Sequence, residues 1–286
     1  QRVSSASRPT VVIGMVAPAL GRAVWRLVQS DARQPTGPSA RIRMQMEEGD
    51  VKQSAVVVGA TGGIGRALVR RIAADPQFDI CWATSRAGAP VPGAQAVALD
   101  LQDDASLQAL GERIGQGPPP TLIVVATGVL HDGKSPERAY RQLDRDHLER
   151  DFRINAIGPA LVARSLLPLM PRDRRAVFAA LSARVGSISD NRLGGWHAYR
   201  ASKAALNMIL RNLAIEMART HPLAVVAGLH PGTVDTHLSA PFQKGVAPER
   251  LFSPAAAADH LLGVLAGLTP SDTGGVFAWD GARIPS

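Results

Sequence analysis

Residues 54–68 read SAVVVGATGGIGRAL, an apolar run that leads through a glycine-rich turn into a helical pattern. Continuous apolar character predicts a strand buried on both faces, here over 54–60. The next residues predict a helix over 63–76, ended by Pro76. A strand that turns directly into a helix is the first half of a βαβ unit, so this stretch favours an α/β fold.

The rest of the chain repeats this alternation of apolar runs and helical patterns. Further strands are predicted at 78–85, 94–101, 121–128, 175–182, 223–230 and 275–281. Helices are predicted at 104–115, capped by Asp103 or Asp104, at 146–169 with a kink at Pro159, at 197–220 and at 254–266. We therefore predict one doubly wound domain, a mostly parallel seven-stranded sheet with helices on both faces and a ligand crevice at the carboxyl ends of the strands.

The basic charge is concentrated at the start of the chain. The net charge is +8 over 286 residues, and residues 1–46 hold seven arginines, no lysine and one acid. The remaining residues hold 25 basic and 23 acidic side chains, a net charge of +2, so we expect no nucleic-acid partner. We interpret 1–50 as a basic extension outside the fold and 51–286 as the folded domain.

Three interpretations of the extension stay open. It is a targeting peptide, a disordered leader, or upstream sequence translated from a start placed too early, with Met44 or Met46 as the natural start. No apolar run reaches the roughly 18 residues of a membrane span. The single cysteine, Cys81, allows no internal disulfide and agrees with a reducing compartment, so we expect a cytoplasmic protein, or an imported one if the extension is a transit peptide.

The glycine-rich turn predicts a nucleotide site. Glycines at 59, 62, 63 and 65 let the backbone approach a pyrophosphate, whose charge the helix N-terminus favours, although tight strand–helix turns also use glycine for shape alone. The second strand ends in ATSR (83–86), with Arg86 and no acid nearby. A base there compensates a ribose 2′-phosphate, which favours NADP(H) over NAD(H), unless Arg86 is merely a solvated side chain at a strand end.

The stretch HAYRASKAALNM (197–208) places Tyr199 four residues before Lys203, so a helix would bring them to one face. Two ordinary residues on an amphipathic helix are the alternative. An ammonium close to a phenol favours the phenolate and moves the phenol pKa toward neutrality. The pair is therefore a candidate for acid/base chemistry.

Taken together, these motifs resemble the short-chain dehydrogenase/reductase family over residues 54 to about 281. The quoted matches are GATGGIG (59–65), YRASK (199–203), HPGTVDT (230–236), the pair Asp100–Leu101 and Asn155 in RINAIGP (153–159). NRLGGWHAYRASKAALN (191–207) most resembles the C-factor/sniffer-like carbonyl reductase subgroup. The resemblance implies a Rossmann-type fold and an NADP(H)-dependent oxidoreductase that acts on a small-molecule carbonyl or secondary alcohol.

The resemblance also implies the site residues. Tyr199 would be the general acid/base, Lys203 would hold the cofactor ribose, Asn155 would support a water relay, and a serine would polarise the carbonyl. The implied cofactor-binding residues are Gly59, Thr61, Gly62, Gly63, Ile64, Gly65, Arg86, Asp100, Leu101, Thr127, Gly128, Tyr199, Lys203, Pro231, Gly232, Val234 and Thr236. No metal site is expected, and a homodimer or homotetramer would form through helices 146–169 and 197–220.

Two segments depart from the family pattern. The family's second serine after the fifth strand is Ala183 here, which leaves Ser182, favoured on proximity, or Ser187 as the polarising residue. VATG (125–128) replaces the usual Asn-Asn-Ala-Gly. These departures leave room for a non-catalytic dinucleotide-binding sensor or signalling protein.

The substrate side of the site is expected after the sixth strand. Residues 237–254 contain two internal prolines and no strong periodicity, which is typical of a mobile lid. Its apolar residues Leu238, Phe242 and Leu251, together with Trp196, either line a hydrophobic pocket or pack against the core.

Overall fold

β1 (Ser54–Val58) lies inside a parallel sheet in this computed structural model, which describes residues 51–131, 133 and 135–286. The predicted extension therefore lies outside the described residues. The main sheet among them has the strand order β3-β2-β1-β4-β5-β6-β9, with every pair parallel. The other strands are β2 Ile80–Ser85, β3 Gln95–Ala98, β4 Pro120–Val125, β5 Ala176–Leu181, β6 Ala224–His230 and β9 Val276–Ala278. The predicted seven-stranded, doubly wound sheet is confirmed.

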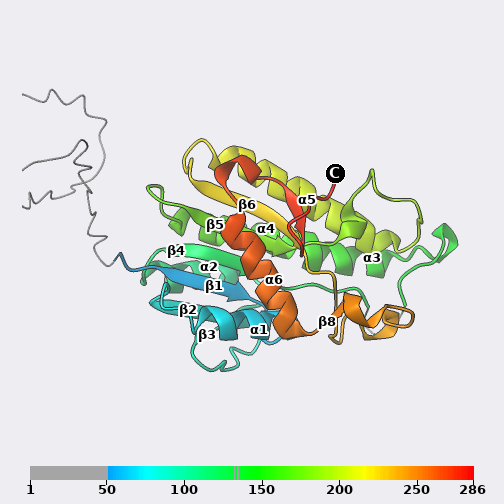
Figure 1. The fold of residues 1–286 in the computed structure, drawn as a ribbon, viewed down its shortest axis with the longest axis horizontal. Helices are drawn as coiled ribbons and strands as arrows, with labels where there is room; N and C mark the ends of the chain where they lie inside the picture. The colour runs from blue at the N-terminus through cyan, green and yellow to red at the C-terminus, as the bar shows by residue number, and fades with distance from the viewer. Residues whose placement is uncertain (1–50, 132, 134) are drawn as a thin grey trace, which may run out of the picture. The chain divides into compact units, whose positions relative to one another are not determined.

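Helices cover both faces of this sheet (Figure 1). Along β1, Ala55 and Val57 pack toward one face, and Val56 and Val58 toward the other, because side chains of a strand alternate. The first face is covered by α1 and α6, and the second by α2, α4 and α5. The helices are α1 Gly63–Ile72, α2 Asp104–Gly115, α3 Arg145–Phe152, α4 Gly158–Leu166, α5 His197–Met217 and α6 Pro254–Gly267.

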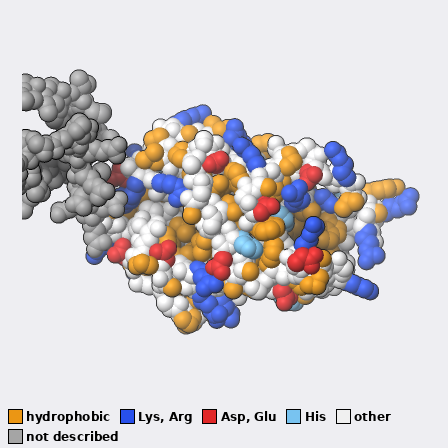
Figure 2. Space-filling model, in the orientation of Figure 1, with side chains coloured by type: hydrophobic (Ala, Val, Ile, Leu, Met, Phe, Trp, Pro, Cys, Tyr) orange, Lys and Arg blue, Asp and Glu red, His pale blue; other side chains and the backbone are white. Residues whose placement is uncertain are grey.

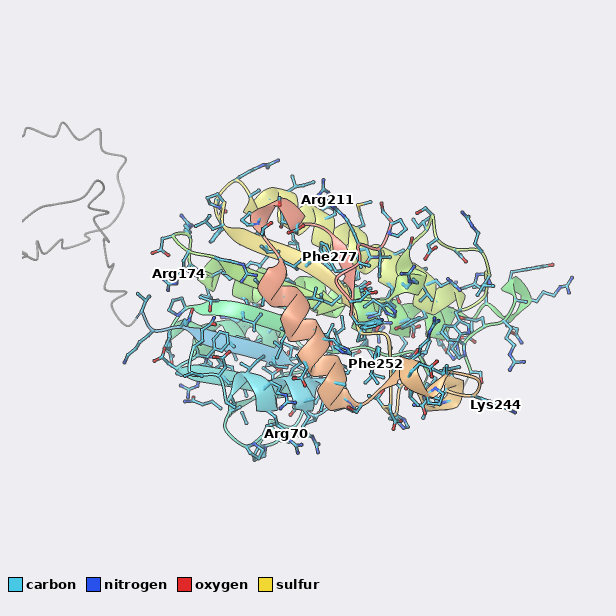
Figure 3. All side chains as sticks on the ribbon, viewed as in Figure 1. Arg70, Arg174, Arg211, Lys244, Phe252 and Phe277 are labelled. Atoms are coloured by element: carbon cyan, nitrogen blue, oxygen red, sulfur yellow. The ribbon has the colours of Figure 1, made fainter. Side chains whose placement is uncertain are left out.

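The charged side chains lie outside these layers. In Figure 3, Arg70, Arg174 and Lys244 lie at the outer edge of the ribbon, whereas Phe277 lies against the sheet and is buried. On the face shown in Figure 2, acidic and basic side chains are interspersed. This distribution agrees with the small net charge of the chain after residue 46. No helix in the described part of the chain combines the length and apolarity that crossing a bilayer requires.

The predicted long helix over 146–169 is wrong as a single α-helix. α3 passes into a π-helical turn, η2 (Arg153–Ile157), then into α4 and a final 3₁₀ turn over Leu167–Leu169. Pro159 has no N–H to donate to the carbonyl of Asn155, so the regular ladder cannot continue there. The predicted irregularity at the proline is thus present, but it takes the form of a π-helical turn that directly precedes the proline.

Other elements are shorter than predicted. The first strand stops at Val58, because Gly59 takes a φ of +86° and turns the chain. The helices predicted at 63–76 and 197–220 end at Ile72 and Met217, and β3 and β9 are each shorter than their apolar runs. Asp103 caps α2, since its carboxylate accepts from the N–H of Ala105 at 3.0 Å.

The topology places the crevice beside β1. Strand order reverses between β1 and β4, whose carboxyl ends diverge into α1 and into the loop after Val125. Ligands of open parallel sheets bind at such a switch point. β5 and β6 also end at this edge of the sheet, and the segments that carry Tyr199 and Thr236 follow them. The glycine-rich turn, Tyr199 and Thr236 are therefore brought to one end of the sheet.

A glycine in the first turn of α1 makes this arrangement testable. A Cβ at Gly65 would lie 2.1 Å from the carbonyl oxygen of Gly59, so Gly65→Ala should lower the free energy of unfolding by about 1–3 kcal/mol. A Cβ at Gly263 in α6 would meet nothing within 4 Å, and Gly263→Ala should raise the free energy of unfolding by about 0.5–1 kcal/mol. Urea unfolding measures both, and an unchanged midpoint for Gly65→Ala would contradict the close packing.

Candidate active site

The turn between β1 and α1 borders a cavity of about 400 Å³ at the carboxyl ends of β1, β2 and β4. At the turn itself, Gly59 and Gly62 leave no side chain between the backbone and the cavity. The cavity brings together eight of the predicted cofactor residues: Gly59, Thr61, Gly62, Arg86, Asp100, Leu101, Thr127 and Gly128. Sequence reasoning missed Gln102 and Ile154, which also line it and adjoin predicted residues.

Two hydroxyl groups in this cavity lack partners. Thr84 and Thr127 line it, and the buried Oγ1 of each makes no hydrogen bond to the described residues. A buried hydroxyl without a partner costs free energy, so a polar ligand at this place would be stabilising. Arg86 is exposed at the cavity and adds a positive charge. A bare backbone turn, orphaned hydroxyls and a cation fit a nicotinamide dinucleotide.

The other predicted cofactor residues lie beside this cavity. A Cβ at Gly63 would lie 2.7 Å from Cγ2 of Thr236, so the start of α1 touches the segment after β6. Ile64, Pro231, Gly232, Val234 and Thr236 line a neighbouring cavity of about 380 Å³. That cavity also contains Tyr199.

Tyr199 and Lys203 lie on the first two turns of α5, and both are buried. The ammonium of Lys203 lies 5.7 Å from the centre of the Tyr199 ring and donates to the carbonyl oxygen of Leu181 at 2.7 Å. A Cβ on Gly128 would lie 3.7 Å from this ammonium, so Lys203 lies close to a lining residue of the first cavity, while Tyr199 lines the second. The pair therefore lies between the two cavities.

Burial shifts both groups of the pair. Burial raises the pKa of the Tyr199 phenol well above its usual value, and the negative charge of Asp151 raises it further. Burial lowers the pKa of Lys203 to about 8, against the opposing effect of Asp151. Near pH 7 the phenol and the amine are thus both protonated, and the expected shift of the phenol pKa toward neutrality is wrong for this structure, because burial outweighs the nearby ammonium.

Asn155 lies in η2 and clamps the loop after β4. Its Oδ1 accepts from the N–H of Val129 and its Nδ2 donates to the carbonyl of Val129, both at 2.9 Å. Nδ2 also donates to Ser202 Oγ at 3.1 Å, and Ser202 donates to the carbonyl of Tyr199. The side chain thus braces the loop that lacks the usual asparagines and ties it to α5.

The second cavity has an apolar wall around Tyr199. Leu130, Ala183 and Tyr199 form a buried cluster, against which Val185, Trp196, Leu238 and Phe242 pack. All seven line the cavity, so the expectation of an apolar pocket holds for Trp196, Leu238 and Phe242. Leu251 does not line it and instead pairs with Thr233 in the small β7–β8 sheet (Thr233–Val234 and Leu251–Phe252).

The serines near Tyr199 are directed elsewhere. Ser182 lines the cavity, but its hydroxyl donates to Oδ1 of Asn207 at 2.6 Å. Ser187 is buried, accepts from the N–H of Asp190 and is not among the lining residues. Ala183, where the family pattern has serine, contributes only a methyl group. In this conformation the prediction that Ser182 polarises the carbonyl is not supported, because its one proton is already used.

His230 lines the cavity but is not among the predicted site residues, although it begins the HPGTVDT match. It ends β6 directly before Pro231 and lines the cavity with Tyr199. Burial lowers the pKa of its imidazole to about 4, with help from the positive charge of Arg184, so it is neutral at pH 7. His230 directly precedes the predicted cofactor residues Pro231 and Gly232, and this position in the sequence could have identified it as a site residue.

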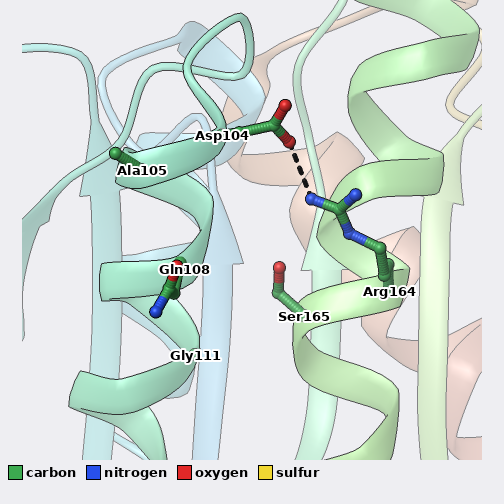
Figure 4. A pocket seen from close by; sticks show the side chains of 6 residues that line it. All are labelled: Asp104, Ala105, Gln108, Gly111, Arg164 and Ser165. Atoms are coloured by element: carbon green, nitrogen blue, oxygen red, sulfur yellow. Dashed lines mark hydrogen bonds and ion pairs between the residues drawn. The ribbon is translucent and has the colours of Figure 1, made fainter.

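A further depression lies between α2 and α4, away from these cavities. Figure 4 shows Asp104 of α2 paired with Arg164 of α4 across it, with Nη2 and Oδ1 2.7 Å apart. Its volume is about 550 Å³, yet its lining contains no predicted site residue and is completed by Ala105, Gln108, Gly111 and Ser165. The candidate site is therefore the pair of cavities at the carboxyl ends of the strands.

Comparisons with known proteins agree with this geometry. The family model for short chain dehydrogenase matches residues 53–247. C-signal of Myxococcus xanthus is 33% identical over 147 residues, covering 51% of this chain and 83% of that protein. The 1-hydroxy-2-glutathionyl-2-methyl-3-butene dehydrogenase of Rhodococcus sp. (strain AD45) is 29% identical over 223 residues, covering 77% of this chain and 93% of that protein.

Solved structures share the fold. NADPH-bound carbonyl reductase from chicken fatty liver superposes with a TM-score of 0.70 at 23% identity, and carbonyl reductase Sniffer of D. melanogaster with 0.68 at 19%. Each comparison covers 82% of this chain and 99% of the other. The predicted resemblance to the C-factor/sniffer-like group is thereby confirmed. This chain belongs to the short-chain dehydrogenase family and is an oxidoreductase of the kind that uses a nicotinamide cofactor.

Proposed function

We propose that this protein is an NADP(H)-dependent carbonyl reductase in which Tyr199 is the general acid. One observation carries the proposal: a buried phenol lines an apolar cavity, and the ammonium of Lys203 beside it lies close to Gly128, which lines the neighbouring glycine-rich cavity. A substrate in the apolar cavity would meet the phenol on one side and the cofactor on the other. The names of the structural neighbours, carbonyl reductases, agree with this substrate class.

Each residue of the site has its own part in the chemistry. The cofactor, when bound, supplies a hydride to the carbonyl carbon. Tyr199 gives its phenolic proton to the carbonyl oxygen, so that the C=O double bond becomes an alcohol. Lys203 stabilises the phenolate left behind, and the carbonyl of Leu181 keeps the ammonium in place. Asn155 keeps the loop after β4 against α5 and so fixes the floor between the two cavities.

NADP(H) is favoured over NAD(H) because of Arg86. It is the basic side chain at the cavity next to the end of β2, where a 2′-phosphate would need a cation. Two structural neighbours, the chicken carbonyl reductase and a short-chain dehydrogenase/reductase from Burkholderia multivorans, have NADPH or NADP bound.

A second candidate is a non-catalytic dinucleotide-binding sensor or signalling protein. The observation that favours it is the missing second donor, because Ala183 is apolar and Ser182 is bonded to Asn207. The buried Tyr199–Lys203 pair argues against it, since keeping two polar groups under the apolar wall is costly unless they are used. Turnover with carbonyl compounds separates the two candidates.

Replacing the phenol tests the acid directly. Tyr199→Phe should reduce kcat by about 10²–10⁴-fold, the usual contribution of a general acid, while NADPH still binds. The matched control is Tyr140→Phe, since Tyr140 is the only other tyrosine and is 65% exposed. The assay follows NADPH oxidation with a panel of aldehydes, ketones and quinones. Undiminished activity of Tyr199→Phe would reject the assignment.

The pH profile of carbonyl reduction should follow Lys203. Its ammonium is charged below about pH 8 and neutral above, because burial lowers its pKa to that value. The phenol stays protonated over this range, so kcat/KM for reduction should be level at lower pH and fall as pH rises through about 8. Initial rates on both sides of that value measure this, and a profile without a decline would contradict the role of Lys203.

Arg86→Ala should weaken binding of NADPH about 10–100-fold, the loss expected for a charge-assisted hydrogen bond, and leave NADH binding unchanged. Arg70→Ala is the control, because Arg70 is an exposed arginine at the end of α1 that lines neither cavity. Titration of protein fluorescence with each cofactor gives the two dissociation constants. Equal weakening for both cofactors would show that Arg86 does not read the 2′-phosphate.

A further inference from the structure

The catalytic helix α5 begins without a cap of its own. Its N-cap residue, Trp196, makes no side-chain capping bond, and the first turn of α5 has no acidic residue. Trp196 also has a φ of +49° and is the one non-glycine residue with positive φ in the described part of the chain. Such a conformation costs an L-residue free energy and persists only where the surroundings impose it.

The two residues before Trp196 prepare this conformation. Gly194 and Gly195 each have a φ of +64°, so three consecutive residues are left-handed. A Cβ on Gly195 would lie 3.3 Å from the backbone oxygens of both Glu137 and Arg138, so this turn packs directly on the loop before α3. The start of α5 is therefore shaped by a segment some 60 residues earlier in the chain.

Glu137 in that loop supplies the missing cap. Its Oε2 accepts from the N–H of Ala198 at 3.4 Å, and its backbone oxygen accepts from the N–H of Trp196. The side chain is only 3% exposed. A carboxylate at the positive end of a 21-residue helix satisfies an orphan N–H and is favoured by the helix dipole.

The surroundings show that this carboxylate is held at a cost. Its Oε1 is buried without a hydrogen bond and lies 4.0 Å from Nδ1 of His147. Asp151, also buried, lies close enough for the two acids to repel, and Arg150 pairs with Asp151 at 2.7 Å. A second buried acid beside Asp151 is unfavourable, and its interaction with the N-terminus of α5 is what compensates this cost.

Trp196 connects this cap to the substrate cavity. Its ring meets that of Tyr199 edge to face, with centroids 6.3 Å apart and an interplanar angle of 73°. It also packs on Phe242, with centroids 4.9 Å apart. All three rings line the cavity. The backbone conformation of Trp196 therefore decides where the wall of the cavity stands relative to the acid.

We propose that Glu137 is a positioning residue: its side chain caps α5 at the N–H of Ala198, next to the left-handed Trp196 whose N–H its backbone oxygen accepts, and this cap fixes the aromatic wall beside Tyr199. The inference rests on the proposed carbonyl reductase activity, because that wall is where the substrate would lie. It assigns Glu137 no contact with substrate or cofactor.

The test compares Glu137→Gln, which keeps an acceptor oxygen, with Glu137→Met, which keeps the bulk without one. For a bulky aryl ketone, Glu137→Met should raise KM about tenfold, the scale of a lost helix cap, with kcat little changed. A small aliphatic aldehyde should show no such rise, since it does not need the wall. Glu137→Gln should match the wild type for both substrates.

Asp272→Ala is the matched control. The Asp272 carboxylate also accepts from a backbone N–H, that of Thr269 at 2.9 Å, but it lies in the turn before β9 and lines neither cavity. Asp272→Ala should lose thermal stability and keep both KM values. If Glu137→Met behaves in the same way, or if folded Glu137→Gln shows the raised KM, the positioning role is rejected. Should Glu137→Met not fold, Glu137→Ala, which also lacks the acceptor oxygen, takes its place with the same expected KM values.

Hydrogen exchange separates this inference from the proposed activity. In Glu137→Met the amide of Ala198, which loses its acceptor, should exchange faster than in wild type, while the amides at the end of α5 stay as protected. Wild-type protein that reduces no carbonyl in the panel would reject the proposed function, whereas unchanged exchange in Glu137→Met would reject the cap.

Discussion

The buried ammonium of Lys203 is the constraint on which the site depends. An amine inside the protein loses its hydration, and the lowered pKa shows how strongly burial opposes its charge. One direct bond, to the carbonyl of Leu181 at the end of β5, compensates it. That bond requires α5 to lie in fixed register on the sheet, and the same register brings Tyr199 to the mouth of the crevice. Cofactor cavity, acid and sheet are thereby tied to one side chain.

The π-helical turn η2 also fixes the position of α5, through Asn155. A regular helix over 146–169 would rotate Asn155 away from the position it has after the extra residue in the turn. In the π-helical turn, its amide pairs with both backbone groups of Val129 and reaches Ser202 on α5. Pro159, which forbids the regular ladder, and Asn155, which uses the irregular one, are therefore parts of one device that replaces the family's usual asparagines after β4.

The sequence predicts well the features that depend on chain order, and much less well the directions of side chains and the irregular backbone. Parallel strands joined by helices end at one edge, so Gly59, Thr127 and Tyr199 had to meet there, and they do. Ser182 was favoured on proximity, but its hydroxyl turns to Asn207, a partner 25 residues away that no local pattern indicates. Glycines at 194 and 195 suggest a turn, but nothing local places Trp196 in a left-handed conformation or names a capping acid some 60 residues earlier. Both depend on tertiary contacts, which local propensities do not contain.

These departures have a common consequence for substrate choice. Ala183 and the bonded hydroxyl of Ser182 leave no serine donor beside Tyr199, around which the wall of Leu130, Trp196, Leu238 and Phe242 is built. With a second donor, two bonds would orient the carbonyl, and the shape of the wall would matter less. In the proposed reductase, without that serine, more of the orientation must come from apolar contact, which is non-directional and works only if the wall is rigid. An aromatic wall anchored at α5 itself would meet this requirement, because Tyr199 and the wall would then move together.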